Sequence, residues 1–227
     1  MRMGEDPFQN LRRQMVAEIV TEAALTAGHT GRAAFSERVL DAIGTMPRHE
    51  FVPVELQPYA YLNRPLPIGY EKTVSQPFIV ALMTDLLDPK PGDSVLEVGT
   101  GSGYQAAVVA EIVARVYTIE IVEELGRKAE QTLKSLGYAN VVCRVGDGYA
   151  GWPEHAPFDS IMVTAAAPEV PQPLIDQLKP GGRLVIPVGG QFEIQLLLVV
   201  EKKADGTTTT RRTIPVRFVP LVRGGLR

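Results

Sequence analysis

The sequence predicts an α/β fold: a doubly wound, mostly parallel sheet with antiparallel C-terminal strands and an N-terminal helical cap. One observation is the regular alternation of helical and strand-like apolar patterns from about residue 76 onward. A second is the glycine-rich turn at residues 99–103, which joins an apolar strand pattern to an apolar helical pattern. A third is that no helical pattern separates the strand patterns after residue 190, which indicates antiparallel pairing there.

The N-terminal cap, about residues 6–50, is predicted to be helical. One stripe of apolar residues at helical spacing, which we expect to face the core, consists of Phe8, Leu11, Met15 and Ile19. A polar break at residues 28–31 follows this stripe. Ser36 is then expected to cap a second helix over residues 37–43.

Residues 51–75 are rich in proline and therefore cannot form a continuous helix or a central strand. A long ordered loop is more often functional than idle, although a stiff connector is the alternative. We expect one domain over residues 1–227. Its cap and proline-rich substrate loop occupy residues 1–75, and its α/β core occupies residues 76–227.

The core is expected to open with a helix at Ser75-Gln76-Pro77 that ends at residues 89–92. Strands are expected near residues 93–98, 115–120, 140–146, 158–163, 182–188, 192–201 and 207–215. Further helices are expected near residues 103–113, 123–136 and 172–178. Residues 179–182 read as a helix stop followed by a turn, and Asp205-Gly206 as the turn of the terminal hairpin.

Composition excludes several classes of protein. The 227 residues are 45% hydrophobic and 22% charged, with a net charge of −3, so a basic footprint for nucleic acid is missing. No apolar run reaches the roughly 18 residues of a membrane span, and residues 1–8 show no signal-peptide pattern. The single cysteine, Cys143, is expected to be a buried structural thiol. We expect a cytoplasmic monomer that binds neither nucleic acid nor membrane.

The spacing of the glycines indicates which nucleotide-like ligand is bound. A dinucleotide turn has the form Gly-x-Gly-x-x-Gly, which requires Gly or Ala at position 104, but this position is Tyr104. Gly99, Gly101 and Gly103 instead show the spacing typical of S-adenosylmethionine (SAM) sites. Thr100 and Ser102 complete this predicted cofactor-binding turn.

Glu120 ends the next predicted strand, 21 residues after Gly99. A carboxylate at this place can accept hydrogen bonds from both ribose hydroxyl groups of the ligand. The alternative is an ordinary solvated carboxylate at a strand end.

Several motifs resemble the protein-L-isoaspartate O-methyltransferases of the bacterial type. The similarity runs in order from about residue 46 to 222, and its most specific motifs are Thr73-Val74-Ser75-Gln76-Pro77 and Val163-Thr164-Ala165-Ala166-Ala167-Pro168. The other matching segments are residues 64–69, 98–104, 117–120, 145–148, 151–153 and 217–221. Residues 70–72 differ from the Gly/His-rich version expected in many relatives, and Phe78 stands where some carry His.

The resemblance implies a repair enzyme for isoaspartyl residues, which arise by asparagine deamidation and aspartate isomerisation. Such an enzyme transfers the SAM methyl group to the freed α-carboxylate of the isoaspartyl residue and releases S-adenosylhomocysteine. The ester then closes to a succinimide, which reopens partly as normal aspartate. The implied partners are damaged peptides and proteins, and no metal is required.

The proposed chemistry needs no general base. A carboxyl group with a pKa near 3.5 is ionised at neutral pH, so the protein has to supply in-line approach and to exclude water. The absence of an evident His/Asp pair is therefore compatible with this reaction. His29, His49 and His155 are interpreted as structural or surface residues.

Ser75 is the candidate catalytic residue. It precedes Pro77 at a helix start, where free N–H groups and the positive dipole end favour an anion, and its hydroxyl can hold the isoaspartyl carboxylate. A plain helix N-cap is the alternative. The resemblance assigns this serine the active-site role.

Small residues close the fourth strand at Thr164-Ala165-Ala166-Ala167. Base-methylating enzymes carry Asn/Asp-Pro-Pro-aromatic there, so this strand end argues against an adenine or cytosine N-methyltransferase. The residues either leave room for a peptide backbone or form a tightly packed strand end. Asp147-Gly148, after the third strand, is predicted to recognise adenine, with a simple turn cap as the alternative.

The proline-rich loop and the C-terminal segment are expected to wall a peptide groove that reads main chain rather than side chains. The candidate substrate-binding residues are Leu66, Pro67, Ile68, Gln76, Pro77, Thr164, Ala165, Val219, Pro220 and Leu221. Alternatives are a SAM methyltransferase acting on another carboxylate or small molecule, a binding module without turnover, and an NAD-dependent oxidoreductase.

Overall fold

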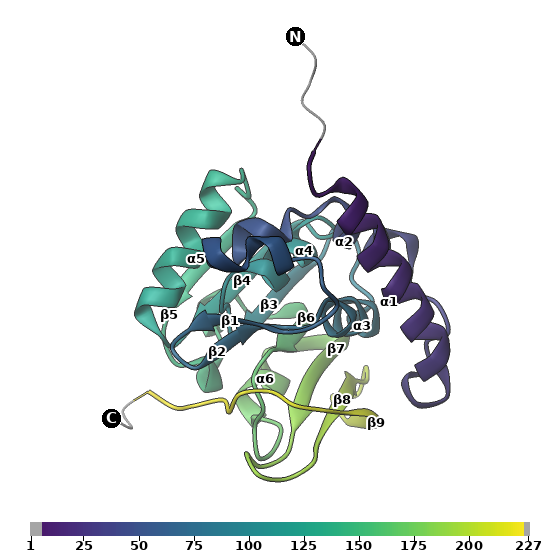
Figure 1. Cartoon of the computed structure of the whole chain (residues 1–227). Helices are drawn as coiled ribbons and strands as arrows, with labels where there is room; N and C mark the ends of the chain where they lie inside the picture. Colours follow the sequence, from purple (N-terminus) through teal and green to yellow (C-terminus); the bar gives the residue numbers. More distant parts are fainter. Residues whose placement is uncertain (1–5, 225–227) are drawn as a thin grey trace.

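The computed structural model describes residues 6–224, which form a seven-stranded sheet with helices packed against it (Figure 1). The strand order is β5-β4-β3-β6-β7-β8-β9, in which β3 to β7 are parallel and β8 and β9 antiparallel. The strands are β3 (Ser94–Val98), β4 (Arg115–Glu120), β5 (Val141–Val145), β6 (Phe158–Val163), β7 (Leu178–Val188), β8 (Gln195–Lys202) and β9 (Thr208–Val216). The predicted mostly parallel sheet with antiparallel C-terminal strands is confirmed.

Helices cover the two faces of the sheet unequally. The helices are α1 (Gln9–Thr30), α2 (Glu37–Thr45), α3 (Pro77–Leu87), α4 (Tyr104–Ala110), α5 (Glu123–Ser135) and the short α6 (Gln172–Asp176). Residues of α1 to α5 share one apolar core with Val95 of β3, whereas α6 and Trp152 pack with Leu96 on the opposite face. Neighbouring residues of β3 thus point into different cores, as the two-residue period of a strand requires.

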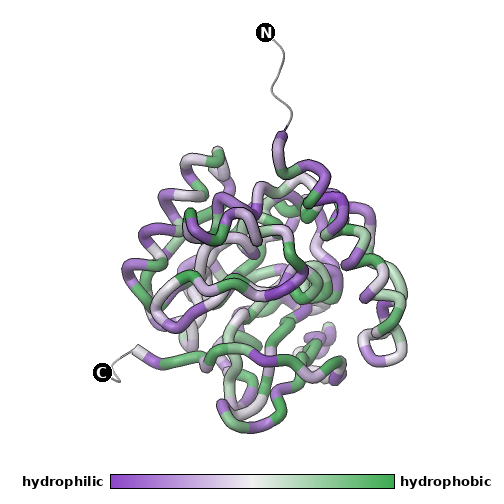
Figure 2. The backbone as a smooth tube through the Cα atoms, viewed as in Figure 1, coloured by the Kyte–Doolittle hydropathy of each residue, from purple (hydrophilic) through white to green (hydrophobic). Residues whose placement is uncertain are grey.

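The cap differs from the predicted pattern in two places. Leu11 is 41% exposed, so the predicted stripe is wrong at this position, whereas Met15 and Ile19 are buried. Helix α1 also continues through the predicted break and ends at Gly31, whose φ of 70° is left-handed. Figure 2 shows hydrophilic and apolar residues alternating along α1 and α5, as expected for helices with one face on the core.

Helix α2 begins after Ser36, which occupies the predicted N-cap position. Its side chain makes no capping hydrogen bond. Its backbone N–H instead donates to Asp85 Oδ1 at 2.8 Å, which ties the cap to helix α3.

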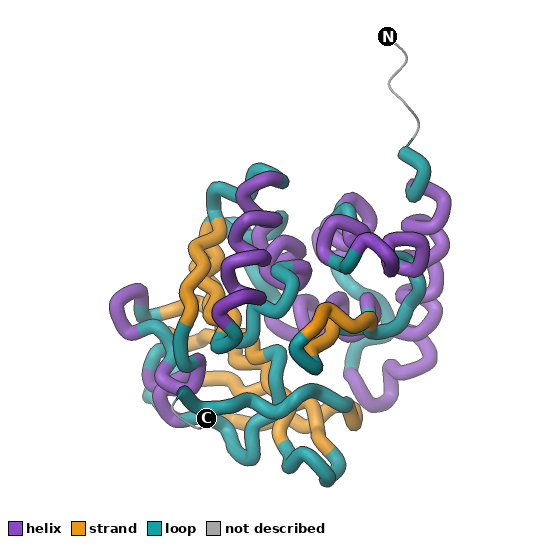
Figure 3. Tube along the Cα trace, turned by 60° about the vertical axis from the view of Figure 1, so that its left-hand side comes forward, coloured by secondary structure: helices purple, strands orange, loops and turns teal. Residues whose placement is uncertain are grey.

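The proline-rich segment forms neither a continuous helix nor a central strand, as predicted. The 3-10 helix η1 (Arg48–Phe51) leads into it, and it contains the 3-10 helix η2 (Val54–Tyr59), followed by a separate two-stranded sheet, β1 (Leu66–Gly69) and β2 (Lys72–Val74). Tyr70 and Glu71, at the hairpin turn, both have left-handed φ, 53° and 55°. The hairpin lies above the ends of the sheet strands, and the loop after β9 crosses below it (Figure 3).

The predicted turn at residues 179–182 is wrong. These residues belong to β7, which already pairs at Leu178 with Phe158 and whose register shifts between Phe158 and Ser160. The irregular register accommodates Gly181, whose φ is 84°. Within residues 6–224, no helix is long and apolar enough to cross a membrane. The expectation about a signal peptide rests in part on residues 1–5, which lie outside the described residues.

Candidate active site

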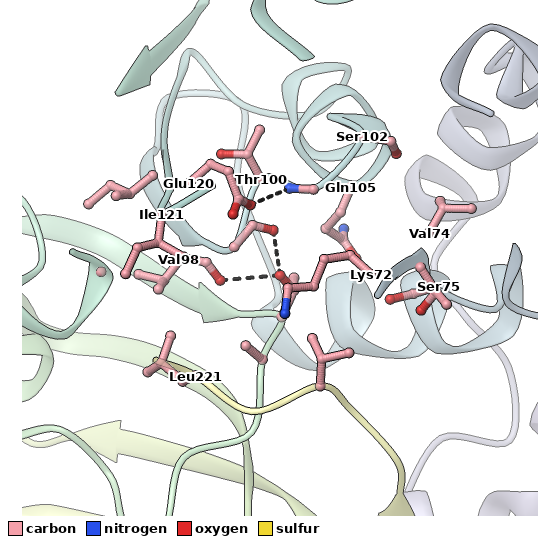
Figure 4. Close-up of a pocket in the computed structure, with 18 of the residues that line it drawn as sticks. Lys72, Val74, Ser75, Val98, Thr100, Ser102, Gln105, Glu120, Ile121 and Leu221 are labelled. Atoms are coloured by element: carbon pink, nitrogen blue, oxygen red, sulfur yellow. Dashed lines mark hydrogen bonds between the residues drawn. The ribbon is translucent and has the colours of Figure 1, made fainter. Parts of the chain in front are cut away.

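A cavity lies at the carboxyl ends of β3, β4 and β6, between the β1–β2 hairpin and the loop that follows β9 (Figure 4). This is the edge of an open α/β sheet at which ligands bind. The predicted site residues that line it are Ser75, Gly99, Thr100, Gly101, Ser102, Glu120, Gly148, Thr164, Ala165, Val219, Pro220 and Leu221. The fold thus brings together segments that are far apart in the sequence.

Glu120 is held in place by the glycine turn. The backbone N–H of Gly101 donates to Glu120 Oε2 at 2.8 Å, and that of Val122 donates to Oε1 at 2.9 Å. The side chain is only 6% exposed, so it is not an ordinary solvated carboxylate. Each carboxylate oxygen has two lone pairs, which leaves both of them able to accept a further hydrogen bond.

Gly99 begins the turn in close contact with β6. Its φ is 101°, and a Cβ atom at this position would lie 2.4 Å from Thr164 Oγ1. The Thr164 hydroxyl donates to the Gly99 carbonyl oxygen at 2.6 Å, with the Val98 carbonyl at 3.2 Å. Thr164, which also lines the cavity, therefore fixes the glycine turn.

Ser75 is not the helix N-cap, because Gln76 occupies that position of α3. Within residues 6–224, the Ser75 hydroxyl makes no hydrogen bond, and it faces the cavity (Figure 4). The Ser75 carbonyl oxygen accepts a hydrogen bond from Arg48 Nη2 at 2.9 Å. The serine backbone is thus anchored while its hydroxyl is free to bind a ligand.

Arg48 is a functional candidate that sequence reasoning missed. It is completely buried, donates a hydrogen bond to the Ala60 carbonyl, and places its guanidinium 5.2 Å from the centre of the Tyr104 ring. Burial lowers the pKa of Arg48. No local signal could have revealed it, because an arginine that follows a proline, here Pro47, looks like a surface residue.

Several other predicted residues do not line this cavity: Gly103, Asp147, Leu66, Pro67, Ile68, Gln76 and Pro77. Gly103 begins α4 and packs under α5, where a Cβ atom would lie 3.2 Å from Leu133 Cδ1. Leu66 and Ile68 are buried in β1, whereas Pro67 is exposed. The reason is that β2, rather than β1, is the hairpin strand that lines the cavity.

Gln76 lines a second cavity that shares Ser75, Thr73 and Val219 with the first. Its side-chain amide donates to the Glu22 carboxylate of α1 at 3.3 Å. Pro77 is buried as the first residue of α3.

Asp147 caps the turn after β5. Its Oδ1 accepts from the backbone N–H of Tyr149 at 2.9 Å, and its Oδ2 accepts from that of Gly224, also at 2.9 Å. Gly148 does line the cavity, and a Cβ atom there would lie 2.2 Å from Val98 Cγ1. The carboxylate therefore contacts the C-terminal segment, which sequence reasoning did not anticipate.

The cavity also contains lining residues that were not predicted, among them Lys72, Val74, Gln105 and Ile121. Lys72 and Val74 flank Thr73, the first residue of the family motif at residues 73–77, and Ile121 follows Glu120, so proximity in sequence was an available signal. Gln105 donates to Thr84 Oγ1 of α3 at 2.9 Å, which no local pattern indicates.

The remaining titratable candidates lie outside the cavity. His49 stacks on Phe8 with ring centres 4.3 Å apart, and His155 stacks on Tyr117 at 4.2 Å. Cys143 is half-buried in β5, and burial raises the pKa of its thiol to about 12. This thiol is therefore protonated at neutral pH and is a poor nucleophile.

Glu97 lies beneath the glycine turn and is 1% exposed. It accepts a hydrogen bond from the Thr118 hydroxyl, whose oxygen lies 2.6 Å from that of Thr100. Burial raises the pKa of Glu97 to about 8. The neutral acid is thus the form that the fold favours.

We expect Glu97→Gln to remove a pH dependence of stability. Because the folded pKa lies above the unfolded value of 4.5, the wild-type free energy of unfolding loses this contribution as pH rises from about 4.5 to about 8. Urea unfolding is measured at intervals from pH 5 to 8. The free energy of unfolding of Glu97→Gln, relative to that of wild type, should increase by up to about 1.4 kcal/mol per pH unit. The exposed Glu169→Gln is the control, and a pH-independent difference for Glu97→Gln would contradict the prediction.

A protein-family model described as "Protein-L-isoaspartate(D-aspartate) O-methyltransferase (PCMT)" matches residues 21–225. The chain belongs to this family. Protein-L-isoaspartate O-methyltransferase 1 of Cupriavidus necator is 62% identical over 219 residues, 96% of this chain and 85% of that relative. Protein-L-isoaspartate O-methyltransferase 2 of Syntrophobacter fumaroxidans is 57% identical over 221 residues, 97% of this chain and 90% of that relative.

Solved structures agree with the family assignment. A protein-L-isoaspartate O-methyltransferase structure covers 95% of this chain and 67% of its own, with a TM-score of 0.80 and 29% identity. A Plasmodium falciparum structure, described as a beta-aspartate methyltransferase in complex with S-adenosyl-L-homocysteine, has a TM-score of 0.77 and covers 97% of this chain and all of its own. At 23% identity, this second likeness concerns the fold.

Proposed function

We propose that the protein transfers the methyl group of SAM to the α-carboxylate of L-isoaspartyl residues in peptides and proteins, and so starts their repair. The observation that carries this proposal is the placement of the Ser75 hydroxyl, which has no partner among residues 6–224, in the cavity that also contains the glycine turn and Glu120. Membership of the family supports the reaction class.

The residues of the cavity fit SAM. Glu120 would accept hydrogen bonds from the ribose hydroxyl groups. A ligand could lie close to the backbone of the turn at residues 99–102, because two of these residues lack a Cβ atom. When bound, SAM supplies an electrophilic methyl group on a sulfonium. We assign adenine contacts to Gly148 and to the carboxylate of Asp147, which retains lone pairs beside its two capping bonds.

The lining residues suit an acceptor that is already charged. Among the described residues around the cavity, Glu120 is the single carboxylate, and both of its oxygens accept a backbone hydrogen bond. The isoaspartyl carboxylate needs no proton removed, so the task of Ser75 is to donate a hydrogen bond that orients it. Arg48 donates a hydrogen bond to the Ser75 carbonyl oxygen, which fixes the backbone of this serine and so helps to position its hydroxyl.

We infer that the peptide main chain lies along the second cavity, which opens beside Ser75 and is lined by Gln76 and Val219. The C-terminal segment is fixed there by backbone bonds of Ala166 to Val219 and Leu221, at 2.8 and 2.7 Å. A groove lined by backbone can bind peptides of many sequences, because its hydrogen bonds are made to the main chain of the peptide. Leu66, Pro67 and Ile68 would then support the hairpin rather than touch the acceptor.

A methylation assay on paired peptides tests this function. A peptide with one isoaspartyl residue should be methylated, and the same peptide with aspartate should be methylated at least about a hundredfold more slowly, because a misplaced carboxylate loses the effective concentration of the site. Equal rates on both peptides would contradict the proposal and favour another carboxylate substrate. The monomeric state expected from the sequence can be checked by light scattering on the same sample.

A further inference from the structure

We propose that the ammonium group of Lys72 binds a carboxylate inside the cavity, either that of the isoaspartyl acceptor or that of the methionine part of SAM. This inference deepens the proposed function and rests on it. Lys72 is the first residue of β2, and its side chain extends into the cavity (Figure 4). It shares one face of this strand with Val74, which also lines the cavity.

The charges around the cavity support this role. Lys72 and Glu120 are the charged residues among its described lining. Both Glu120 oxygens accept hydrogen bonds from backbone N–H groups, and within residues 6–224 the Lys72 side chain takes part in no ion pair or hydrogen bond. A half-buried ammonium without a counter-charge is unfavourable, and a bound carboxylate would remove that cost.

The position of Lys72 selects the kind of ligand. Glu120 occupies the β4 wall, where the ribose is proposed to bind, whereas Lys72 enters from the hairpin, three residues before Ser75. Both carboxylates brought to the reaction would lie on this Ser75 side, beyond the ribose. The tight turn with left-handed Tyr70 and Glu71 fixes where β2 begins and thus the origin of the Lys72 side chain.

The expected effect is on binding rather than on the chemical step. An ammonium that pairs with the acceptor carboxylate stabilises the bound ground state and also withdraws charge from the attacking oxygen. Removing it should therefore raise KM for the peptide without lowering kcat. A pair with SAM should instead show in the Kd of S-adenosylhomocysteine.

The test compares Lys72→Met and Lys72→Arg with wild type, and Lys203→Met is the matched control because Lys203 is exposed near the β8–β9 turn. Peptide KM and kcat are measured together with the calorimetric Kd of S-adenosylhomocysteine and of 5′-methylthioadenosine, which lacks the carboxylate. We expect Lys72→Met to raise one of the two constants, peptide KM or S-adenosylhomocysteine Kd, by about tenfold or more. Lys72→Arg should retain most of the binding, and added salt should weaken binding by wild type more than by Lys72→Met.

The two arms distinguish the source of the carboxylate. A raised peptide KM with unchanged S-adenosylhomocysteine binding identifies the acceptor, and weakened S-adenosylhomocysteine with unchanged methylthioadenosine binding identifies the cofactor. Unchanged constants, or equal weakening of both nucleosides with unchanged KM, would overturn the proposal. If wild type shows no preference for isoaspartyl peptide, the proposed function fails, whereas the comparison of the two nucleosides still tests Lys72.

Discussion

Substitution of Gly99 by alanine is expected to lower the affinity for S-adenosylhomocysteine by at least about a hundredfold. The added methyl group would lie 2.4 Å from Thr164 Oγ1, and alanine is strained at a φ of 101°. Thr164 cannot simply move away, because its hydroxyl donates to the Gly99 carbonyl. Strain of about 1–3 kcal/mol and overpacking of similar size would both act on the turn that receives the ligand.

Calorimetric titration of folded Gly99→Ala with S-adenosylhomocysteine measures this loss, and a thermal scan shows whether the fold persists. Gly92→Ala is the matched control, because a Cβ atom there would meet no atom within 4 Å. It should bind like wild type. Wild-type affinity in Gly99→Ala would show that the turn does not contact the ligand.

Substitution of Ser75 by alanine is expected to reduce kcat/KM for an isoaspartyl peptide by about 10- to 100-fold, since a hydrogen bond to a charged group contributes about 1.5–3 kcal/mol. The hydroxyl caps no helix and makes no hydrogen bond within residues 6–224, so its loss should leave the thermal midpoint nearly unchanged. The Kd of S-adenosylhomocysteine should change little, because the proposed partner of the hydroxyl is the acceptor.

Steady-state kinetics with the peptide and calorimetry with S-adenosylhomocysteine separate these effects. The control is Ser36→Ala, another serine beside a helix start whose side chain makes no capping bond. It should retain full activity. Full activity of Ser75→Ala would remove the catalytic assignment of this serine.

The parts of the site that could be predicted are those encoded in continuous segments. The glycine turn follows directly on β3, and Glu120 ends β4, so strand pattern, spacing and the rule for parallel sheets place them together. Ser75 belongs to a motif that marks the family. Each of these signals is local, so it can be recognised without knowing which other elements pack against the segment.

The differences between local sequence patterns and the structure arise from packing between segments that are distant in sequence. The Asp147 carboxylate, which is predicted to bind adenine, also accepts a hydrogen bond from the backbone N–H of Gly224, because the C-terminal segment returns across the strand ends. Leu11 satisfies a helical period, yet no other element covers it, so it remains exposed. The turn expected at residues 179–182 became strand because Leu178 pairs with Phe158. In each case the presence or absence of a partner distant in sequence decided the outcome.

The sequence by itself determined the α/β class, the type of ligand that the glycine spacing admits, and the identity of the serine and carboxylate at the strand ends. The tertiary structure alone decided that a buried Arg48 anchors Ser75 and that Lys72 enters the cavity. The physical reason is that burial and pairing of a charge depend on what packs around it in space. The sequence does not show whether an arginine or a lysine is surrounded by water or by carbonyl groups.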